Sequence, residues 1–134
     1  MDSSTPLKGK RKTGQHYEQL ALEWLKQQGL SSVTQNFNCR LGEIDLIMLD
    51  QQTLCFIEVK YRKNNAFGGT AFSIPPSKQH KITRSALTFI AMHKTWQRHN
   101  YRFDALFVQP DGSSTGHGFE WIKNAFEAAP TASC

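Results

Sequence analysis

The sequence predicts an α/β fold in which one mixed β-sheet is flanked by helices on both faces. Two apolar runs, 44–49 and 54–57, enclose the polar positions 50–53 and are typical of a β-hairpin. Helical periodicity precedes this hairpin over 13–28 and follows it over 77–93. The order helix, strand, hairpin, helix, strand, strand fits a single sheet between two helical layers.

The first helix is expected to begin at Thr13 or Gly14 and to end at Gln28, because Gly29 is a favoured residue at helix ends. Glu18 borders the core-facing stripe of this helix, and its position alone is typical of an ordinary boundary residue. The stripe consists of five residues at helical spacing: Tyr17, Leu20, Ala21, Trp24 and Leu25.

Turn and capping signals predict the remaining elements. A first strand is expected over 32–39, and a second helix over about 77–94 with Ser77 as its N-cap. Strands rich in Phe, Leu and Val are expected at 102–109 and around 119–122. The second helix would form a right-handed crossover, so the strands before and after it are expected to be parallel.

The length and charge of the chain indicate one basic domain. A chain of 134 residues fits a single domain, for which we expect the boundaries 14–126. Residues 1–13 are expected to form a disordered basic arm, and residues 127–134 a tail. The net charge of +5 favours a polyanionic partner such as nucleic acid.

Membrane and secreted classes are disfavoured. No apolar run approaches the ~20 residues that span a bilayer, and no basic-then-apolar leader precedes the fold, so we expect no membrane association. Three cysteines, Cys39, Cys55 and Cys134, lack metal-ligand spacing and are expected to be reduced thiols. These features predict a cytoplasmic protein.

The hairpin carries the candidate site. If Leu49 pairs with Leu54 across the turn, the same register places Asp45 opposite Glu58. Alternation along the strands then puts Asp45, Glu58 and Lys60 on one face. Opposed carboxylates repel unless a cation lies between them, and a divalent metal that prefers oxygen ligands suits this gap. With Lys60 as a fixed positive charge, the group is suited to phosphodiester cleavage.

A plainer interpretation of the same residues is open. The register also opposes Glu43 to Lys60, and a cross-strand ion pair there would be worth a few tenths of a kcal/mol. However, the charges interrupt strands apolar enough to be covered on both faces. Unpaired charges are costly to bury, and a metal together with Lys60 would compensate them.

The hairpin motif resembles a known family. The sequence reads Gly-Glu-Ile-Asp-Leu-Ile from Gly42 and Phe-Ile-Glu-Val-Lys-x-Arg from Phe56, which is similar to the UPF0102 (YraN-like) family of the PD-(D/E)xK nuclease superfamily. The resemblance covers roughly residues 14–126, and it departs at Ile44, where the nominal motif has proline. It implies a restriction-endonuclease-like fold, with a mixed β-sheet flanked by helices on both faces.

The resemblance also implies an activity, that of a metal-dependent endonuclease. Asp45 and Glu58, with the Val59 carbonyl, would bind Mg²⁺ or Mn²⁺. Lys60 would orient the attacking water, and Glu18 would bind a second metal or position that water. No element that reads base sequence is visible, so we expect structure-selective cleavage, on DNA more than RNA, of branched substrates as in the similar archaeal junction resolvases.

Six basic residues are expected to bind nucleic acid: Arg40, Arg62, Lys63, Lys78, Lys81 and Arg84. Two of them lie in the loop 61–73, which could equally be an ordinary surface loop. Three lie in the first turns of the second helix, where cations oppose the helix dipole unless they meet an anion. Asp104 is expected to form an ion pair with Arg102 or Arg40 rather than to join the site.

Two alternatives from other classes remain open. The chain could be a non-catalytic module that binds nucleic acid and keeps the nuclease fold. It could also be an interaction protein without a nucleic-acid partner, although this leaves the basic start of the second helix unexplained. A homodimer is compatible with the sequence.

Overall fold

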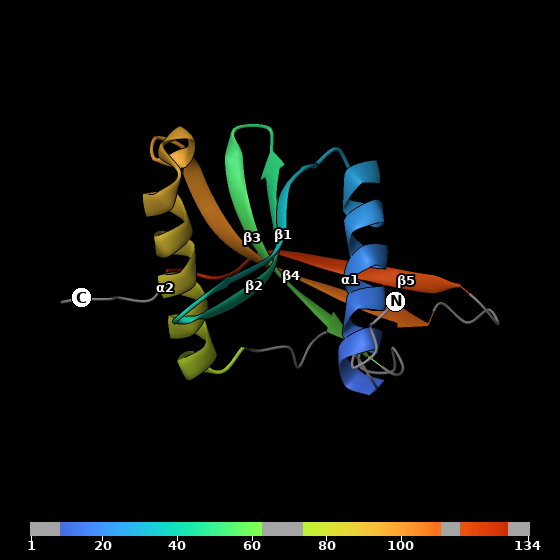
Figure 1. The fold of residues 1–134 in the computed structure, drawn as a ribbon. Helices are drawn as coiled ribbons and strands as arrows, with labels where there is room; N and C mark the ends of the chain where they lie inside the picture. The colour runs from blue at the N-terminus through green and yellow to red at the C-terminus, as the bar shows by residue number, and fades with distance from the viewer. Residues whose placement is uncertain (1–8, 63–73, 111–115, 129–134) are drawn as a thin grey trace, which may run out of the picture.

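The computed structural model describes residues 9–62, 74–110 and 116–128 of the chain. Two helices lie on opposite sides of a five-stranded sheet (Figure 1), so the predicted α/β fold is confirmed, and it is consistent with a restriction-endonuclease-like arrangement. Among the described residues no helix is both long and apolar enough to cross a bilayer. The elements are α1 Gly9–Gln27, β1 Ser31–Cys39, β2 Gly42–Asp50, β3 Thr53–Tyr61, α2 Pro76–Met92, a 3-10 turn Lys94–Trp96, β4 Asn100–Pro110 and β5 His117–Phe126.

The strands follow one another across the sheet in the order of the sequence. The β3–β4 pair is parallel, as predicted for strands joined through a helix, and the other three pairs are antiparallel. In the hairpin Leu49 pairs with Leu54, so the predicted register is confirmed.

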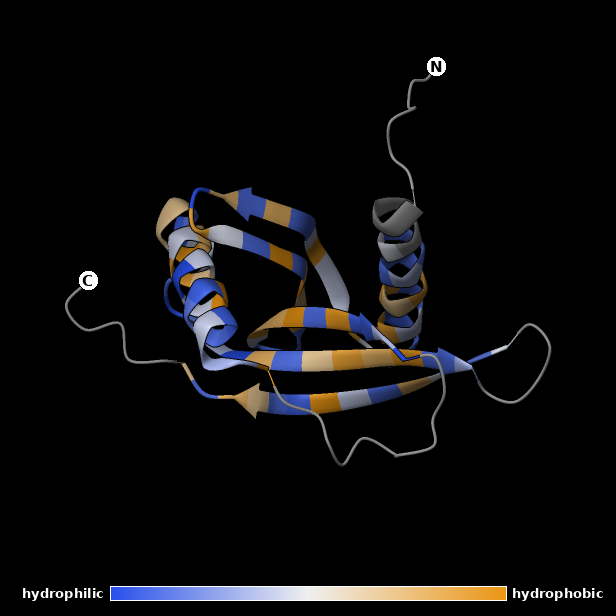
Figure 2. Cartoon of the chain, turned by 90° about the horizontal axis from the view of Figure 1, so that it is seen from below, coloured by the Kyte–Doolittle hydropathy of each residue, from blue (hydrophilic) through white to orange (hydrophobic). Residues whose placement is uncertain are grey.

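Each face of the sheet carries its own hydrophobic core. Figure 2 shows orange and blue bands alternating along the strands between the two helices, the pattern of a sheet whose side chains point to both faces. The core under α1 is built around Ala21, Leu25, Leu46, Met48, Cys55, Ile57, Leu106 and Val108. The core under α2 is built around Ile44, Ile47, Leu54, Phe56, Ile82, Ala86, Phe89 and Phe103. The predicted stripe of α1 faces its core, with Tyr17, Leu20 and Trp24 partly buried against it.

Several predicted boundaries differ from the structure. α1 begins at Gly9 rather than at Thr13 or Gly14, and it ends before Gly29, whose φ of 103° suits a residue without a side chain. The prediction of Ser77 as N-cap was wrong. α2 has Pro75 at that position because Pro76, with its fixed φ and no N–H to satisfy, is well suited to the first helical position.

Candidate functional site

The hairpin strands separate at the acidic positions. The β2–β3 pairs end at Leu46 and Ile57, and beyond them the N–H of Val59 donates a 2.8 Å hydrogen bond to Oδ2 of Asp45. The alternation of β2 also breaks here, since Ile44 packs in the core under α2 whereas Leu46 packs under α1. A side-chain carboxylate thus replaces a backbone carbonyl, and Asp45 lies between the two strands.

Two predicted pairings are therefore not formed. Neither the opposition of Asp45 and Glu58 nor that of Glu43 and Lys60 is among the β2–β3 pairs, because the ladder ends at Leu46 and Ile57. The two charges that Lys60 meets instead are those of Glu58, whose Oε2 lies 3.8 Å from its Nζ, and of Asp45. Lys60 is consequently placed beside the candidate carboxylates and not against Glu43.

Burial makes the ionised form of Asp45 unfavourable. Desolvation, followed by the negative charge of Glu58, raises the pKa of Asp45 to about 8, although the hydrogen bond from Val59 acts in the opposite direction. Glu18 adds a further repulsive charge. Carboxylates that repel one another in a desolvated site favour a bound cation, whose charge would reverse this effect.

Glu18 reaches the same site from α1. Burial raises the pKa of Glu18, hydrogen bonding with Asp45 and Asn36 opposes that rise, and the charges of Glu43 and Glu58 add to it. Its Oε1 is buried without a hydrogen-bond partner among the described residues. The side chain also lines a cavity of about 280 Å³ whose other walls are Gly14, Gln15, Asn36, Asn38 and Glu43. Position alone gave Glu18 no role, but its packing places it with Asp45.

Two lysines from different elements meet at Glu58. The side chain of Glu58 is 9% exposed, and its Oε2 forms an ion pair with Nζ of Lys78 from the first turn of α2 in addition to the contact with Lys60. Burial, then the neighbouring Lys78, lowers the pKa of Lys60. Burial alone would also lower the pKa of Lys78, but the hydrogen bond and charge of Glu58 outweigh it and raise that pKa. Lys78 is thus the closer partner of Glu58.

The donor chemistry of the site fits Mg²⁺ or Mn²⁺. Among the described residues no three His, Cys, Asp or Glu side chains are already arranged around one point as a metal-binding group. Mg²⁺ does not need such a group, because it keeps several waters and is usually held by one or two carboxylates. Asp45 and Glu58 supply hard oxygen donors, and the unpartnered Oε1 of Glu18 could supply another. The Val59 carbonyl stays a ligand expected from the family resemblance.

The predicted nucleic-acid residues fall into four groups. Arg40, in the turn between β1 and β2, and Lys81 and Arg84 on α2 are exposed. Lys78 is engaged by Glu58. Arg62 is largely taken up by protein contacts, and Lys63 lies outside the described residues, as does most of the loop 61–73 that was expected to carry both.

Arg62 joins β3 to β4 and β5. Its guanidinium donates hydrogen bonds to Gln109 at 3.1 Å and to Glu120 at 3.0 Å, and it lies 3.8 Å from the centre of the Phe107 ring. Its backbone N–H also donates to the carbonyl of Val108. These contacts leave its side chain only 18% exposed, so Arg62 is placed to hold the end of β3.

Comparison with known proteins assigns the chain to a family. The profile of the family described as "Uncharacterised protein family UPF0102" matches residues 17–108, which is more than half of the chain. The chain belongs to this family. It is 45% identical over 120 residues to a UPF0102 protein of Alcanivorax borkumensis, covering 90% of this chain and 95% of that protein. It is 49% identical over 111 residues to a UPF0102 protein of Psychromonas ingrahamii, covering 82% of this chain and 85% of that protein.

The ion pair predicted for Asp104 is confirmed in this UPF0102 chain. Asp104 is 1% exposed and accepts hydrogen bonds from Nε of Arg102 at 3.0 and 3.1 Å, from Nε1 of Trp121 at 2.9 Å and from the backbone N–H of Asn124 at 3.1 Å. Arg102 also donates to Asp50 at 2.8 Å. Because both oxygens of Asp104 are used, this carboxylate joins strands β4 and β5 and is separate from the candidate site.

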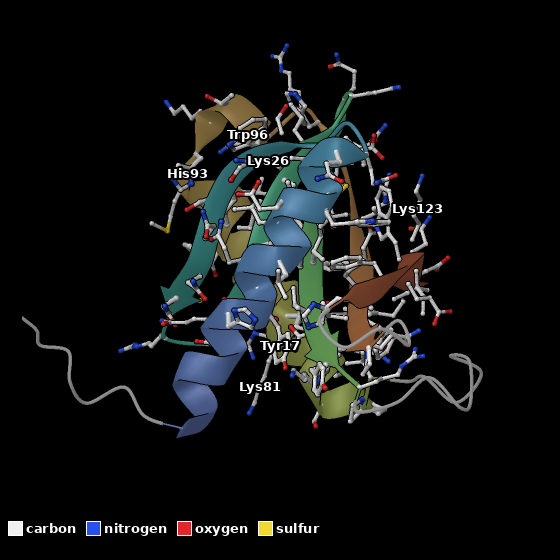
Figure 3. The ribbon with its side chains drawn as sticks, turned by 90° about the vertical axis from the view of Figure 1, so that its right-hand side faces the viewer. Tyr17, Lys26, Lys81, His93, Trp96 and Lys123 are labelled. Atoms are coloured by element: carbon white, nitrogen blue, oxygen red, sulfur yellow. The ribbon has the colours of Figure 1, made fainter. Side chains whose placement is uncertain are left out.

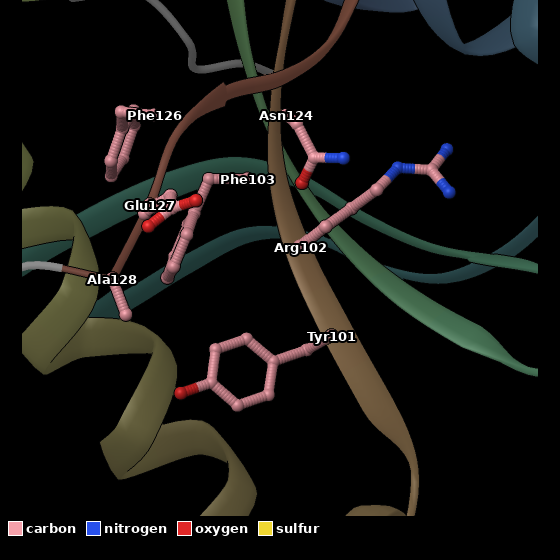
Figure 4. Close-up of a pocket in the computed structure, with 7 residues that line it drawn as sticks. All are labelled: Tyr101, Arg102, Phe103, Asn124, Phe126, Glu127 and Ala128. Atoms are coloured by element: carbon pink, nitrogen blue, oxygen red, sulfur yellow. The ribbon is translucent and has the colours of Figure 1, made fainter.

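A second hollow of the UPF0102 chain lies near this network. It has a volume of about 280 Å³ and is lined by Tyr101, Phe103 and Phe126 together with Arg102 and Asn124 (Figure 4). The rings of Phe103 and Phe126 stack with centroids 4.7 Å apart. None of the candidate carboxylates lines this hollow, so its walls add nothing to the site.

One aromatic contact, between the sequence neighbours of Glu18 and Lys60, was not predicted from the sequence. Tyr17 was assigned only to the core stripe of α1, but its ring stacks on Tyr61 with centroids 4.2 Å apart. Figure 3 shows Tyr17 and Lys81 toward one end of the molecule, and His93 and Trp96 toward the other. Helical periodicity does not show which end of a strand a helix covers. The only sequence signal for this contact with α1 was the aromatic side chain of Tyr61, directly after Lys60.

Proposed function

We propose that this UPF0102 protein is a divalent-metal-dependent endonuclease that hydrolyses phosphodiester bonds in DNA. The observation that carries the proposal is the convergence of Asp45, Glu58 and Lys60 where β2 and β3 separate. Carboxylates can hold a hard cation, and an ammonium group beside them can stabilise negative charge that develops on a phosphoryl group.

Each residue of the site has a proposed role. Asp45, Glu58 and the Val59 carbonyl would hold Mg²⁺ or Mn²⁺, which when bound polarises a phosphoryl oxygen and lowers the pKa of water. Lys60 would orient the attacking water and stabilise the charge that develops on the phosphoryl oxygens. Glu18 would hold a second metal or position that water by hydrogen bonding, and its unpartnered Oε1 is available for either role.

The proposed substrate is DNA selected by its structure. Arg40, Lys81 and Arg84 are exposed cations, and such side chains bind phosphates without reading bases. We therefore propose that branched or junction-like DNA is preferred over a particular sequence. A cytoplasmic location and a homodimer stay predictions from the sequence.

One observation favours a second candidate, a non-catalytic module that binds nucleic acid. Lys78 already neutralises Glu58 in the structure, and a protein that never binds a metal could keep this ion pair permanently. The two candidates differ in their response to divalent cations. Only the endonuclease requires them for a chemical step.

The decisive experiment is cleavage of single-stranded, duplex, flap and four-way DNA with Mg²⁺, Mn²⁺ or EDTA. We expect cleavage that requires metal, that is lost in Glu58→Gln and that is retained in Glu23→Gln, whose carboxylate is exposed on α1. Metal-independent DNA binding without cleavage on any of these substrates would favour the binding module. Cleavage by Glu58→Gln at the wild-type rate would contradict the assignment of the site.

A further inference from the structure

Glu58 is bound in the structure by a cation from another part of the chain. Lys78 follows Glu58 by twenty positions, and its Nζ makes the shortest ion pair of the described residues with Oε2 of that carboxylate. Lys60, on the same strand as Glu58, is farther away at 3.8 Å. The carboxylate that the proposed function gives to a metal is therefore the one that Lys78 occupies.

A metal ion and Lys78 cannot share Glu58 without a cost. Both are positive, and two cations in contact with one carboxylate oxygen repel strongly in a site of low exposure. Asp45 is a second proposed ligand of the same metal, so a bound cation would also neutralise the negative charge of Asp45 that attracts Lys78. Loading of the site should therefore displace Lys78.

The position of Lys78 requires an anion as its partner. It lies in the first turn of α2, a turn that contains no acidic residue, and a cation there is opposed by the helix dipole. Its side chain is 40% exposed, and a lysine side chain is flexible enough to move its ammonium group to another acceptor. Lys81 and Arg84 are exposed on the same helix and would hold bound DNA nearby. A DNA phosphate is therefore the acceptor available to Lys78 once it leaves Glu58.

We propose that Lys78 exchanges partners, binding Glu58 until a divalent cation occupies this carboxylate and then binding a DNA phosphate. The inference rests on the proposed function of the same site. It adds that the two ligands of the site, the divalent cation and DNA, are coupled. Metal binding would release Lys78 for DNA, and DNA would hold Lys78 away from Glu58. By linkage, each ligand raises the affinity for the other by the same factor.

The first measurement is Mn²⁺ binding by calorimetry in the absence of DNA. Lys78→Met removes the competing charge, so we expect Mn²⁺ affinity to rise at least about 5-fold, the lower end of ordinary coupling between sites. Lys94→Met is the matched control, because Lys94 is an exposed lysine of the 3-10 turn that follows α2 and belongs to neither the metal site nor the proposed DNA surface. It should leave Mn²⁺ affinity unchanged. Lys78→Gln, which keeps a hydrogen-bond donor for Glu58, is expected to act like Lys78→Met if the methionine variant does not fold.

The second measurement is the coupling between the ligands. The affinity for a phosphorothioate DNA duplex, which resists hydrolysis, is measured by fluorescence anisotropy with and without Mn²⁺. The gain in DNA affinity on adding Mn²⁺ should be smaller in Lys78→Met than in wild type and should stay at the wild-type value in Lys94→Met. A gain that is unchanged in Lys78→Met would overturn the exchange, even if Mn²⁺ affinity rises.

Failure of this inference differs from failure of the proposed function. If wild type and Glu58→Gln bind Mn²⁺ equally or not at all, the metal site itself is wrong and the exchange falls with it. If wild type binds Mn²⁺ through Glu58 but neither Lys78 variant binds it more tightly, the metal site stands and the exchange is wrong. Weaker Mn²⁺ binding in both Lys78 variants would likewise overturn it.

Discussion

The carboxylate of Asp45 accepts a 2.8 Å hydrogen bond from the backbone N–H of Val59 across the point where β2 and β3 separate. A side chain thus closes the ladder at the place where the backbone ladder ends. This arrangement buries a carboxylate beside Glu58, and it explains why a site suited to a cation can form inside an otherwise apolar hairpin.

The first prediction concerns Asp45 and pH. Its folded-state pKa is raised to about 8, so the protonated form stabilises the fold. This contribution is complete below the unfolded pKa and is lost as the pH rises through about 8. In EDTA, Asp45→Asn should flatten the decline of unfolding free energy between pH 5 and 9 by about 4 kcal/mol, since the three pH units from 5 to about 8 are worth about 1.4 kcal/mol each.

Urea denaturation at several pH values measures this effect. Glu23→Gln removes an exposed carboxylate from α1 and should keep the wild-type profile. A decline that is equally steep in Asp45→Asn would show that another group titrates. Mn²⁺ should be bound more weakly by Asp45→Asn, since one of its proposed ligands is changed.

The second prediction separates Asp104 from the site. Asp104→Asn removes the buried carboxylate that pairs with the 15%-exposed guanidinium of Arg102, so we expect a loss of about 3 kcal/mol in unfolding free energy, although Arg102 keeps Asp50 as a partner. Asp50→Asn, which removes the more exposed partner of Arg102, should cost about 1 kcal/mol. Mn²⁺ affinity should not change in either variant. Weaker Mn²⁺ binding by folded Asp104→Asn would instead make Asp104 a member of the site.

The third prediction concerns the role of Arg62. Arg62→Lys keeps the charge but loses the paired hydrogen bonds to Gln109 and Glu120, so we expect a loss of about 1 kcal/mol in stability. The slope of DNA affinity against salt should stay the same. Arg84→Ala, which removes an exposed cation, should have the reverse pattern, with normal stability and a slope reduced by about 1. Matching salt slopes for Arg84→Ala and wild type would remove Arg84 from the proposed DNA surface.

The sequence was sufficient to predict the hairpin register and the convergence of Glu58 with Lys60. Residues on a strand alternate, and the turn between Leu49 and Leu54 leaves little freedom in pairing. The sequence did not predict that the alternation of β2 breaks at Asp45. An aspartate whose carboxylate accepts the hydrogen bond of a backbone carbonyl looks the same in the sequence as an aspartate on a regular strand. The contacts of Lys78 and Arg62 depend on how α2 and β5 pack against the end of β3, which local periodicity does not encode.

The last prediction concerns Lys60. Its Nζ lies 3.8 Å from Glu58, so a plain role as a neutralising charge would leave it partly replaceable by Lys78, which binds the same oxygen. A catalytic role would require an ammonium group at the attacking water. Under the proposed exchange, Lys78 would be bound to a DNA phosphate and could not supply this group. Lys60→Met should therefore bind Mn²⁺ at least as tightly as wild type and bind DNA normally, but cleave at least about 100-fold more slowly, the scale of one preorganised electrostatic donor. Single-turnover cleavage with saturating Mn²⁺ measures this rate, and a rate within a few-fold of wild type would reduce Lys60 to a partner of Glu58.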